Sequence, residues 1–208
     1  AKEAGDEVIC ILIASKLSGT YQGAMLAKQI VDYDGIHVID AGHAAASVAE
    51  KMLVIAACRM RDQGCTAEEI ARRLEQLRGS VRLIACLDTL EYLARGGRLP
   101  AAVASIGTKL QLKPIIVFGE NGEIQVVKKC MGSKRAMRDM TEMVTERRID
   151  PEYPVIPIFA QNDGNCQEYM AALKNAGCEG TMQAPQGIGA TIGSYIGPGG
   201  YGIVFVEK

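Results

Sequence analysis

The chain has almost no excess charge of either sign. Its 23 Lys and Arg side chains face 24 Asp and Glu, which leaves a formal net charge of −1. A protein that binds nucleic acid or an anionic membrane through overall electrostatics carries a basic excess, so the balance argues against both partners. One basic cluster, Lys128-Lys129 with Lys134-Arg135, is predicted to be a solvated surface beside a helix.

Paired cysteines and long apolar runs are also absent. No two of the cysteines stand in C-x-x-C spacing, and Cys10 and Cys86 lie within apolar strand patterns, so we expect reduced, buried thiols without a disulfide framework or a metal site. No apolar run approaches the length of a membrane span, and no signal-peptide pattern opens the chain. These features predict a cytoplasmic protein without stable membrane insertion. The seven cysteines are Cys10, Cys58, Cys65, Cys86, Cys130, Cys166 and Cys178.

What the chain does contain is apolar sequence, 48% of 208 residues, arranged as alternating strands and helices. Strands are predicted at 8–14 and 36–39, and helices at 18–31 and from about 48 to 63, followed by a helix that Thr66 and Glu69 cap reciprocally. This order is typical of a parallel α/β layer. Residues 1–5 resemble the end of a helix, so we expect an N-terminal portion to be missing.

After residue 79 the pattern changes. A strand at 81–87 leads to a helix start at Asp88 and a stop at Gly96-Gly97, and a further helix is predicted from Leu99-Pro100. Residues 119–122, with Asn-Gly, predict a β-hairpin. A helix capped by Ser133, a strand at 155–160, a helix at 163–176 and a strand at 201–206 follow. The predicted fold class is therefore α/β with two lobes: an incomplete parallel-sheet lobe (1–79) and a mixed-sheet lobe (80–208).

Residues 15–22 (SKLSGTYQ) lie between the first predicted strand and the helix that follows it. The first turn of a helix has unpaired N–H groups and partial positive charge, which favour a phosphate or carboxylate. Ser18 or Thr20 could cap the helix or bond the ligand, and Gly19 lets a ligand approach the backbone. The simpler alternative is that Ser18 is only an N-cap.

The glycine-rich stretch 187–200 is predicted to be a loop between two short strands. It forms either a backbone cradle around a ligand or a tight crossover packed on the sheet. It has no lysine after its glycines and does not follow G-x-G-x-x-G, so it is neither a P-loop nor a dinucleotide site.

Four motifs together resemble the DegV family of bacterial fatty-acid-binding proteins. They are residues 15–22, residues 88–98 (DTLEYLARGGR), residues 113–116 (KPII) and residues 192–199 (IGSYIGPG). The resemblance implies a two-lobed α/β protein that buries one long-chain fatty acid between its lobes. It also implies that the protein presents the carboxylate to a partner fatty acid kinase, has no cofactor and is not itself an enzyme.

The resemblance also implies which residues bind the ligand head group: Ser18, Gly19, Thr20, Arg98, Ser194 and Tyr195. Tyr195 stands where the family often has histidine, and its phenol can donate one hydrogen bond. Arg98 could instead pair with the end of the preceding helix. A further hydroxyl motif of the family normally lies upstream of residue 1. Without the upstream strand the first sheet would expose an edge, so a homo-oligomer through that edge is expected.

Two enzyme classes compete with this interpretation. A serine hydrolase would use Ser18 with His37 or His43, but the segment has no G-x-S-x-G elbow. His37 stands in a strand-like alternation and is predicted to be a core histidine with its hydrogen bonds satisfied. A kinase acting on a small hydroxylated substrate would need a nucleotide motif, which the sequence lacks.

Overall fold

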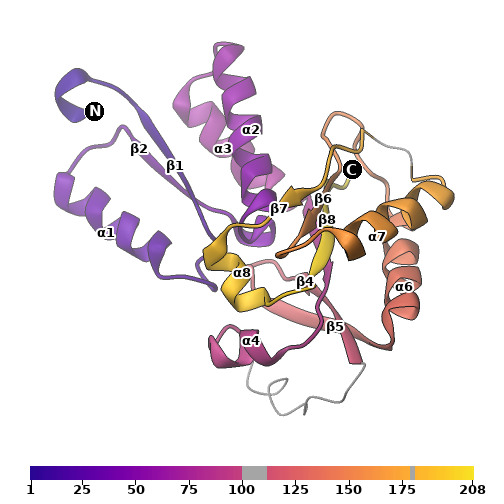
Figure 1. Ribbon diagram of the computed structural model, residues 1–208. Coiled ribbons are helices and arrows are strands. Elements are labelled where there is room, and N and C mark those ends of the chain that lie inside the picture. The colour runs from indigo at the N-terminus through magenta and orange to yellow at the C-terminus, as the bar shows by residue number, and fades with distance from the viewer. Residues whose placement is uncertain (100–111, 179–180) are drawn as a thin grey trace. The chain divides into compact units, whose positions relative to one another are not determined.

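The computed structural model describes residues 1–99, 112–178 and 181–208, which form two compact units. Unit 1 contains Ala1–Val81 and Gly119–Glu123, and unit 2 contains Arg82–Phe118 and Ile124–Lys208. Element labels follow Figure 1. The helix predicted from Leu99-Pro100 lies outside the described residues.

Unit 1 is built on two parallel strands. β1 (Val8–Leu12) pairs with β2 (Ile36–Asp40) in register from Val8 opposite Ile36 to Leu12 opposite Asp40. α1 (Thr20–Val31) connects them and lies on one side of the pair, and α2 (Val48–Asp62) and α3 (Ala67–Leu77) lie on the other (Figure 1). Two 3-10 turns, Lys2–Ala4 and Gly42–Ala44, complete the unit.

The helices of unit 1 differ in how much they bury. α3 begins with the predicted capping box, in which the Glu69 N–H donates to Thr66 Oγ1 at 3.2 Å and the Thr66 N–H donates to Glu69 Oε2 at 3.0 Å. α1 buries no residue and leaves Leu26 59% and Ile30 76% exposed. α2, by contrast, buries an apolar face made of Val48, Ala49, Met52, Leu53, Ala56 and Met60.

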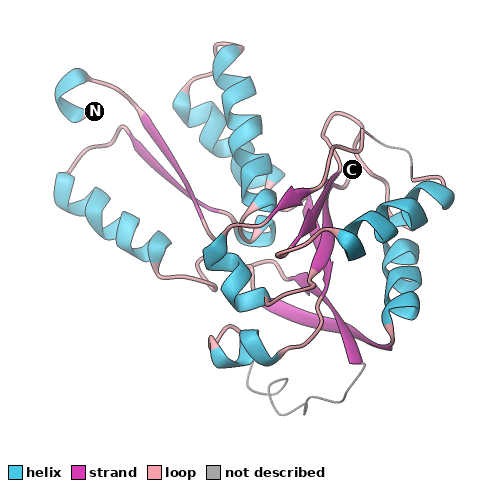
Figure 2. Cartoon of the chain, viewed as in Figure 1, coloured by secondary structure: helices cyan, strands magenta, loops and turns pink. Residues whose placement is uncertain are grey.

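Unit 2 is built on a six-stranded mixed sheet in the order β5-β4-β3-β8-β6-β7. Figure 2 draws the strands in magenta. β4 runs antiparallel to β3 and β5, whereas β6 runs antiparallel to β8 and parallel to β7. The strands are β3 (Val81–Cys86), β4 (Leu112–Phe118), β5 (Ile124–Met131), β6 (Ile156–Phe159), β7 (Gln186–Gly187) and β8 (Tyr201–Val206). The helices are α4 (Glu91–Arg95), α6 (Ser133–Thr145), α7 (Gly164–Asn175) and α8 (Ala190–Ile196).

The core of unit 2 lies between this sheet and the helices α6 and α7. Ile84, Ile115 and Phe205 on the strands pack in one cluster with Met140 of α6 and Tyr169 of α7, and each is at most 1% exposed. Every residue of β8 is buried, as is typical of a central strand covered on both faces. Fully burying one such side chain contributes about 1.5–3 kcal/mol to stability.

The α/β fold class is confirmed, but several predicted details are wrong. The stretch 187–200 is not only loop, because α8 forms within it from Gly189 as N-cap, and α8 contacts α4. Tertiary contact outweighs the low helix propensity of its glycine. Ser133 is the first residue of α6 rather than its cap, since Gly132 takes that position. Asp88 does not cap α4: its carboxylate accepts a hydrogen bond from Lys113 instead.

Asp139 on α6 allows a test of this core, because its side chain is only 11% exposed. The Cys130 thiol donates to Oδ2 at 3.4 Å, and the Arg138 guanidinium donates to Oδ1 at 3.2 Å. Burial acts to raise the pKa of Asp139, but the Cys130 thiol and the charges of Arg138 and Lys128 outweigh burial and lower it. The contribution to the free energy of unfolding is then full above the usual Asp pKa of about 3.9 and is lost as the pH falls through the lowered value.

We expect Asp139→Asn to lower the Tm at pH 7, with a difference from wild type that shrinks below about pH 4. Calorimetry from pH 7 to pH 2.5 measures it. The control is Asp62→Asn, since the Asp62 side chain is 67% exposed in its pair with Arg61 and should matter little. A Tm difference for Asp139→Asn that stays constant into acid would contradict the ionic role.

Candidate functional site

The predicted anion site lies at the start of α1 in unit 1. Gly19 is the N-cap and has no side chain that could cap the helix. The hydroxyls of Ser18 and Thr20 share a hydrogen bond of 2.7 Å, and the Thr20 N–H donates to Ser18 Oγ at 3.3 Å. Ser18 is therefore not the N-cap residue, although its hydroxyl accepts from the first N–H of α1, as a structural role at the helix start requires. Two hydroxyls stand beside this helix start, where the N–H groups have partial positive charge.

Asp40 holds the loops on which this site is built. Its Oδ1 accepts hydrogen bonds from the N–H groups of Ser15 and Gly42, both at 3.0 Å, and so joins the segments that follow β1 and β2. Its carbonyl accepts from the Arg78 guanidinium at 2.8 Å. Asp40 was not identified from the sequence as a site residue, although an acidic residue at a strand end can accept from the backbone N–H two residues on, as Asp40 does from Gly42.

The segment between β2 and α2 is strained. Ala45 has φ 46° and ψ −82°, and Ser47 has φ 59° and ψ −127°. Each such conformation costs on the order of 1–3 kcal/mol for a residue with a Cβ, and such strain often accompanies functional sites. The Ala14 N–H donates to the Ala45 carbonyl at 2.8 Å, which joins this segment to the end of β1.

The unit 2 candidates gather where α4 and α8 end. The Arg98 guanidinium lies 4.9 Å from the centroid of the Tyr195 ring and donates to the Gly96 carbonyl at 2.8 Å. Gly96 is the C-cap of α4, so the predicted alternative that Arg98 pairs with the preceding helix end is confirmed. The Ser194 hydroxyl donates to the Thr191 carbonyl at 2.7 Å within α8.

Glycines of the stretch 187–200 pack against side chains of the same unit. A Cβ at Gly197 would overlap the Tyr92 ring, and a Cβ at Gly199 would overlap the Asp88 carboxylate. Asp88 in turn accepts from Lys113 Nζ at 2.6 Å. Of the two predicted interpretations, this packing favours a tight crossover, because the missing Cβ atoms make room for side chains of this chain.

The structure thus groups the predicted residues in two sets. Ser18, Gly19 and Thr20 lie together in unit 1, and Arg98 and Tyr195 are in contact in unit 2 with Ser194 on the same helix.

Only one of the two histidines lies at the same end of the strand pair as Ser18. His37 pairs with Ile9 in the strand register, three residues before the ends of β1 and β2, which is about 10 Å along the strand from the end that Ser18 follows. Its Nε2 is buried without a hydrogen-bond partner among the described residues and lies 3.6 Å from Glu7 Oε1. The prediction of a satisfied core histidine is wrong in that respect. His43, in the turn Gly42–Ala44, follows β2 at the same end of the strand pair as Ser18.

All seven cysteines are free. Burial raises the pKa of the Cys86 and Cys166 thiols to about 12, so both stay protonated at neutral pH. The prediction of buried thiols holds only for Cys86, Cys130 and Cys166. Cys58 is exposed, and the remaining three cysteines, Cys10 among them, are partly exposed. Within residues 1–99, 112–178 and 181–208, no three His, Cys, Asp or Glu side chains gather as a metal site would require. None of the described helices is both long and apolar enough to cross a membrane.

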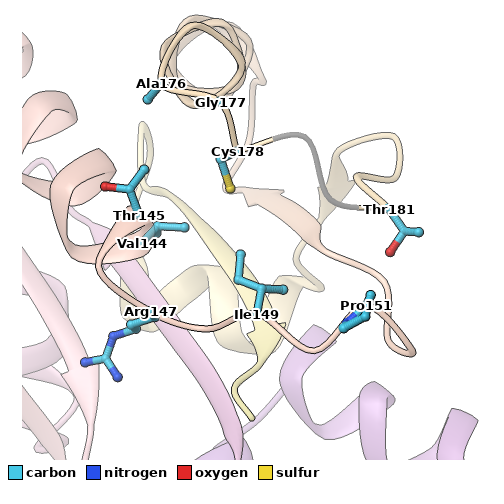
Figure 3. Close-up of a pocket in the computed structure, with 9 residues that line it drawn as sticks. All are labelled: Val144, Thr145, Arg147, Ile149, Pro151, Ala176, Gly177, Cys178 and Thr181. Carbon is cyan, nitrogen blue, oxygen red and sulfur yellow. The ribbon is translucent and has the colours of Figure 1, made fainter.

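A cavity of about 300 Å³ lies elsewhere in unit 2, between the C-terminal ends of α6 and α7 (Figure 3). Its lining includes none of the predicted site residues. The lining residues are Val144, Thr145, Arg147, Ile149, Pro151, Ala176, Gly177, Cys178 and Thr181.

Strain at Ser47 leads to a prediction. Glycine takes its φ and ψ without a Cβ penalty, so Ser47→Gly should raise the free energy of unfolding by about 1 kcal/mol. The matched control is Ala46→Gly, one residue earlier at an ordinary φ, which should lower it by about 0.5–1 kcal/mol. Urea denaturation measures both. If Ser47→Gly destabilises as much as Ala46→Gly does, the strain argument fails.

Comparisons with known proteins agree on one family. The family model described as "Uncharacterised protein, DegV family" matches residues 1–208. A DegV domain-containing protein of Caldanaerobacter subterraneus subsp. tengcongensis is 37% identical over 204 residues, which is 98% of this chain and 71% of that protein.

Two similar solved structures are of DegV family proteins named for fatty acid binding. The DegV family protein of Streptococcus agalactiae has a TM-score of 0.89 at 25% identity, over 100% of this chain and 72% of that one. The protein of Thermus thermophilus has a TM-score of 0.86 at 29% identity, over 100% and 73%. With the family match and the 37% identical relative, the chain belongs to the DegV family.

Proposed function

We propose that this chain binds one long-chain fatty acid, holds its carboxylate and presents it to a partner fatty acid kinase. The observation that carries the proposal is the hydroxyl pair of Ser18 and Thr20 at the start of α1, in a member of a family with fatty-acid-binding relatives. The acid is then substrate for the partner, and this chain supplies no catalytic residue, cofactor or metal.

The carboxylate is the demanding part of the ligand. A buried carboxylate without hydrogen-bond donors or positive charge is costly, so the site must provide both. Ser18 and Thr20 now bond each other, and a carboxylate accepting from both hydroxyls would replace that bond at the positive end of the helix dipole. We propose that Arg98, Ser194 and Tyr195 serve the same head group, with Arg98 supplying the formal charge.

The tail needs apolar surface. Each buried CH₂ contributes roughly 0.8 kcal/mol, so a chain of many carbons binds tightly without a specific polar contact. We propose α2, the helix after Ser47, as a tail contact. Its apolar face of Val48, Met52, Leu53 and Ala56 is already buried in unit 1, so the tail would have to displace part of that packing. The predicted second contact, the helix after Pro100, lies outside the described residues.

We propose that the protein works in the cytoplasm. Charge balance and the absence of a long apolar run in the sequence support a cytoplasmic carrier that binds neither nucleic acid nor membrane stably.

Binding can be tested directly. Organic extraction of the purified protein followed by mass spectrometry should release a long-chain fatty acid, and calorimetry should show that the delipidated protein binds oleate. Ser18→Ala removes one donor to a charged group and should weaken oleate binding about 10- to 100-fold. Ser80→Ala, outside the proposed site in the same unit, is the matched control and should bind as wild type does.

Other outcomes favour the alternatives. A wild-type protein that yields no acid and binds no oleate would contradict the proposal. Labelling of Ser18 by a fluorophosphonate probe would favour the hydrolase with His43 as base, since His37 lies three residues back along its strand. An ATP-dependent product formed by this chain alone would favour the kinase alternative.

We also propose a homo-oligomer through unit 1. Among the described residues β1 pairs only with β2, and parallel sheets normally have both faces covered. α1, beside this pair, leaves Leu26 and Ile30 exposed, one turn apart on the same face. We propose that a second copy pairs with the open edge of β1 and also covers these two side chains.

Light scattering should therefore show a mass that rises with concentration, and the double substitution Leu26→Lys with Ile30→Lys should return the protein to a monomer. Val54→Lys is the control, because Val54 is an exposed apolar residue on α2. A strict monomer at high concentration would contradict the association.

A further inference from the structure

Two tyrosines lock α4 and α8 together in unit 2. Tyr92 of α4 lies against Gly197, the residue that ends α8, so closely that a Cβ there would overlap its ring. Tyr195 of α8 lies in the same way against Gly96, the residue that ends α4. Each helix therefore places one ring on the glycine that terminates the other.

Arg98 depends on this lock through two contacts. Its guanidinium stacks on the Tyr195 ring at 4.9 Å and donates to the Gly96 carbonyl at 2.8 Å. Both contacts belong to the Gly96–Tyr195 half of the lock. The Tyr195 ring stays in place only while α8 keeps its position, and α8 is seated at its end by Tyr92 on Gly197.

We propose that Tyr92 is a positioning residue for Arg98. It holds the end of α8, thereby the Tyr195 ring, and thereby the guanidinium that the ring supports. A long arginine side chain loses considerable rotamer entropy when it is fixed, so fixing it before the ligand arrives lowers the cost of binding an anion. The part of the proposal that concerns the ligand carboxylate rests on the proposed function, whereas the placement of Arg98 does not.

The placement can be tested without ligand. Ring current from Tyr195 should shift the Arg98 side-chain signals in NMR spectra of the full chain with labelled arginine. Assignment comes from Arg98→Ala. We expect Tyr92→Leu to remove most of that shift and Tyr92→Phe, which keeps the ring, to preserve it. The matched control is Tyr33→Leu in unit 1, because the Tyr33 ring packs on Gly35 in a similar way.

The effect on binding is tested with oleate and its uncharged analogue oleyl alcohol. Tyr92→Leu should weaken oleate binding about tenfold, the equivalent of about 1.4 kcal/mol, and alter alcohol binding less than twofold. In an Arg98→Ala background Tyr92→Leu should cause no further loss of oleate affinity. Equal losses for both ligands, or an undiminished loss without Arg98, would mean that Tyr92 is only a packing residue.

The two experiments separate the possible failures. If wild-type protein binds no oleate, the proposed function fails, and the NMR comparison still decides whether Tyr92 places Arg98. If the Arg98 signals are unchanged in a folded Tyr92→Leu protein, the positioning role is overturned whatever the ligand does. Should Tyr92→Leu unfold the protein, Tyr92→Met, which has about the volume of leucine but a flexible, unbranched side chain that fills irregular gaps, takes its place in both experiments.

Discussion

In unit 2, side chains and backbone pack directly on glycines at points where only a hydrogen fits. The Tyr92 ring rests on Gly197, the Tyr195 ring on Gly96 and the Asp88 carboxylate on Gly199, and the carbonyl of Ile84 lies close to Gly202. These contacts set how α4, α8 and β8 approach one another. A methyl group at any of them would force a ring, a carboxylate or a strand to move, so the arrangement of this unit depends on hydrogen at those places.

Unit 1 is organised by hydrogen bonds rather than by close approach of rings. The Asp40 carboxylate joins the loops after β1 and β2, and the Ala14 N–H joins the end of β1 to the strained segment at Ala45. The strain at Ala45 and Ser47 is held by these bonds, because a free loop would relax it. Ser18 and Thr20 come only a few residues after Ser15, whose N–H is bonded to Asp40 at this end of the strand pair.

Local signals in the sequence predicted local structure well. The capping box of Thr66 and Glu69, the hairpin around Gly122 with φ 81° and the C-cap at Gly5 are each set by residues within a few positions of one another. α8 was missed because its glycine content disfavours a helix, and its stability comes from contact with α4, about a hundred residues earlier in the chain.

In the candidate site, too, features set by neighbouring residues were predicted, and features set by distant contacts were not. Ser18 and Thr20 were found from a strand-to-helix transition, although the sequence could not tell that Gly19 rather than Ser18 takes the N-cap. Arg98 and Tyr195 were named from motifs, but their stacking is a contact between residues 97 positions apart, for which neither motif carries a signal. Asp40 and Tyr92 were not identified as functional, because their roles depend on distant partners.

The position of β8 has a consequence for how the chain is made. β8 follows β6 and β7 in sequence, yet it lies between β3 and β6 in the sheet. On the ribosome, the sheet can therefore close only after residues 201–206 have emerged from the exit tunnel, because β8 must pair with β3 on one side and with β6 on the other. Until then the two halves of the sheet present open edges and apolar faces, the kind of surface that chaperones bind. Folding of unit 2 should thus follow its synthesis rather than accompany it, at a rate limited by long-range strand pairing.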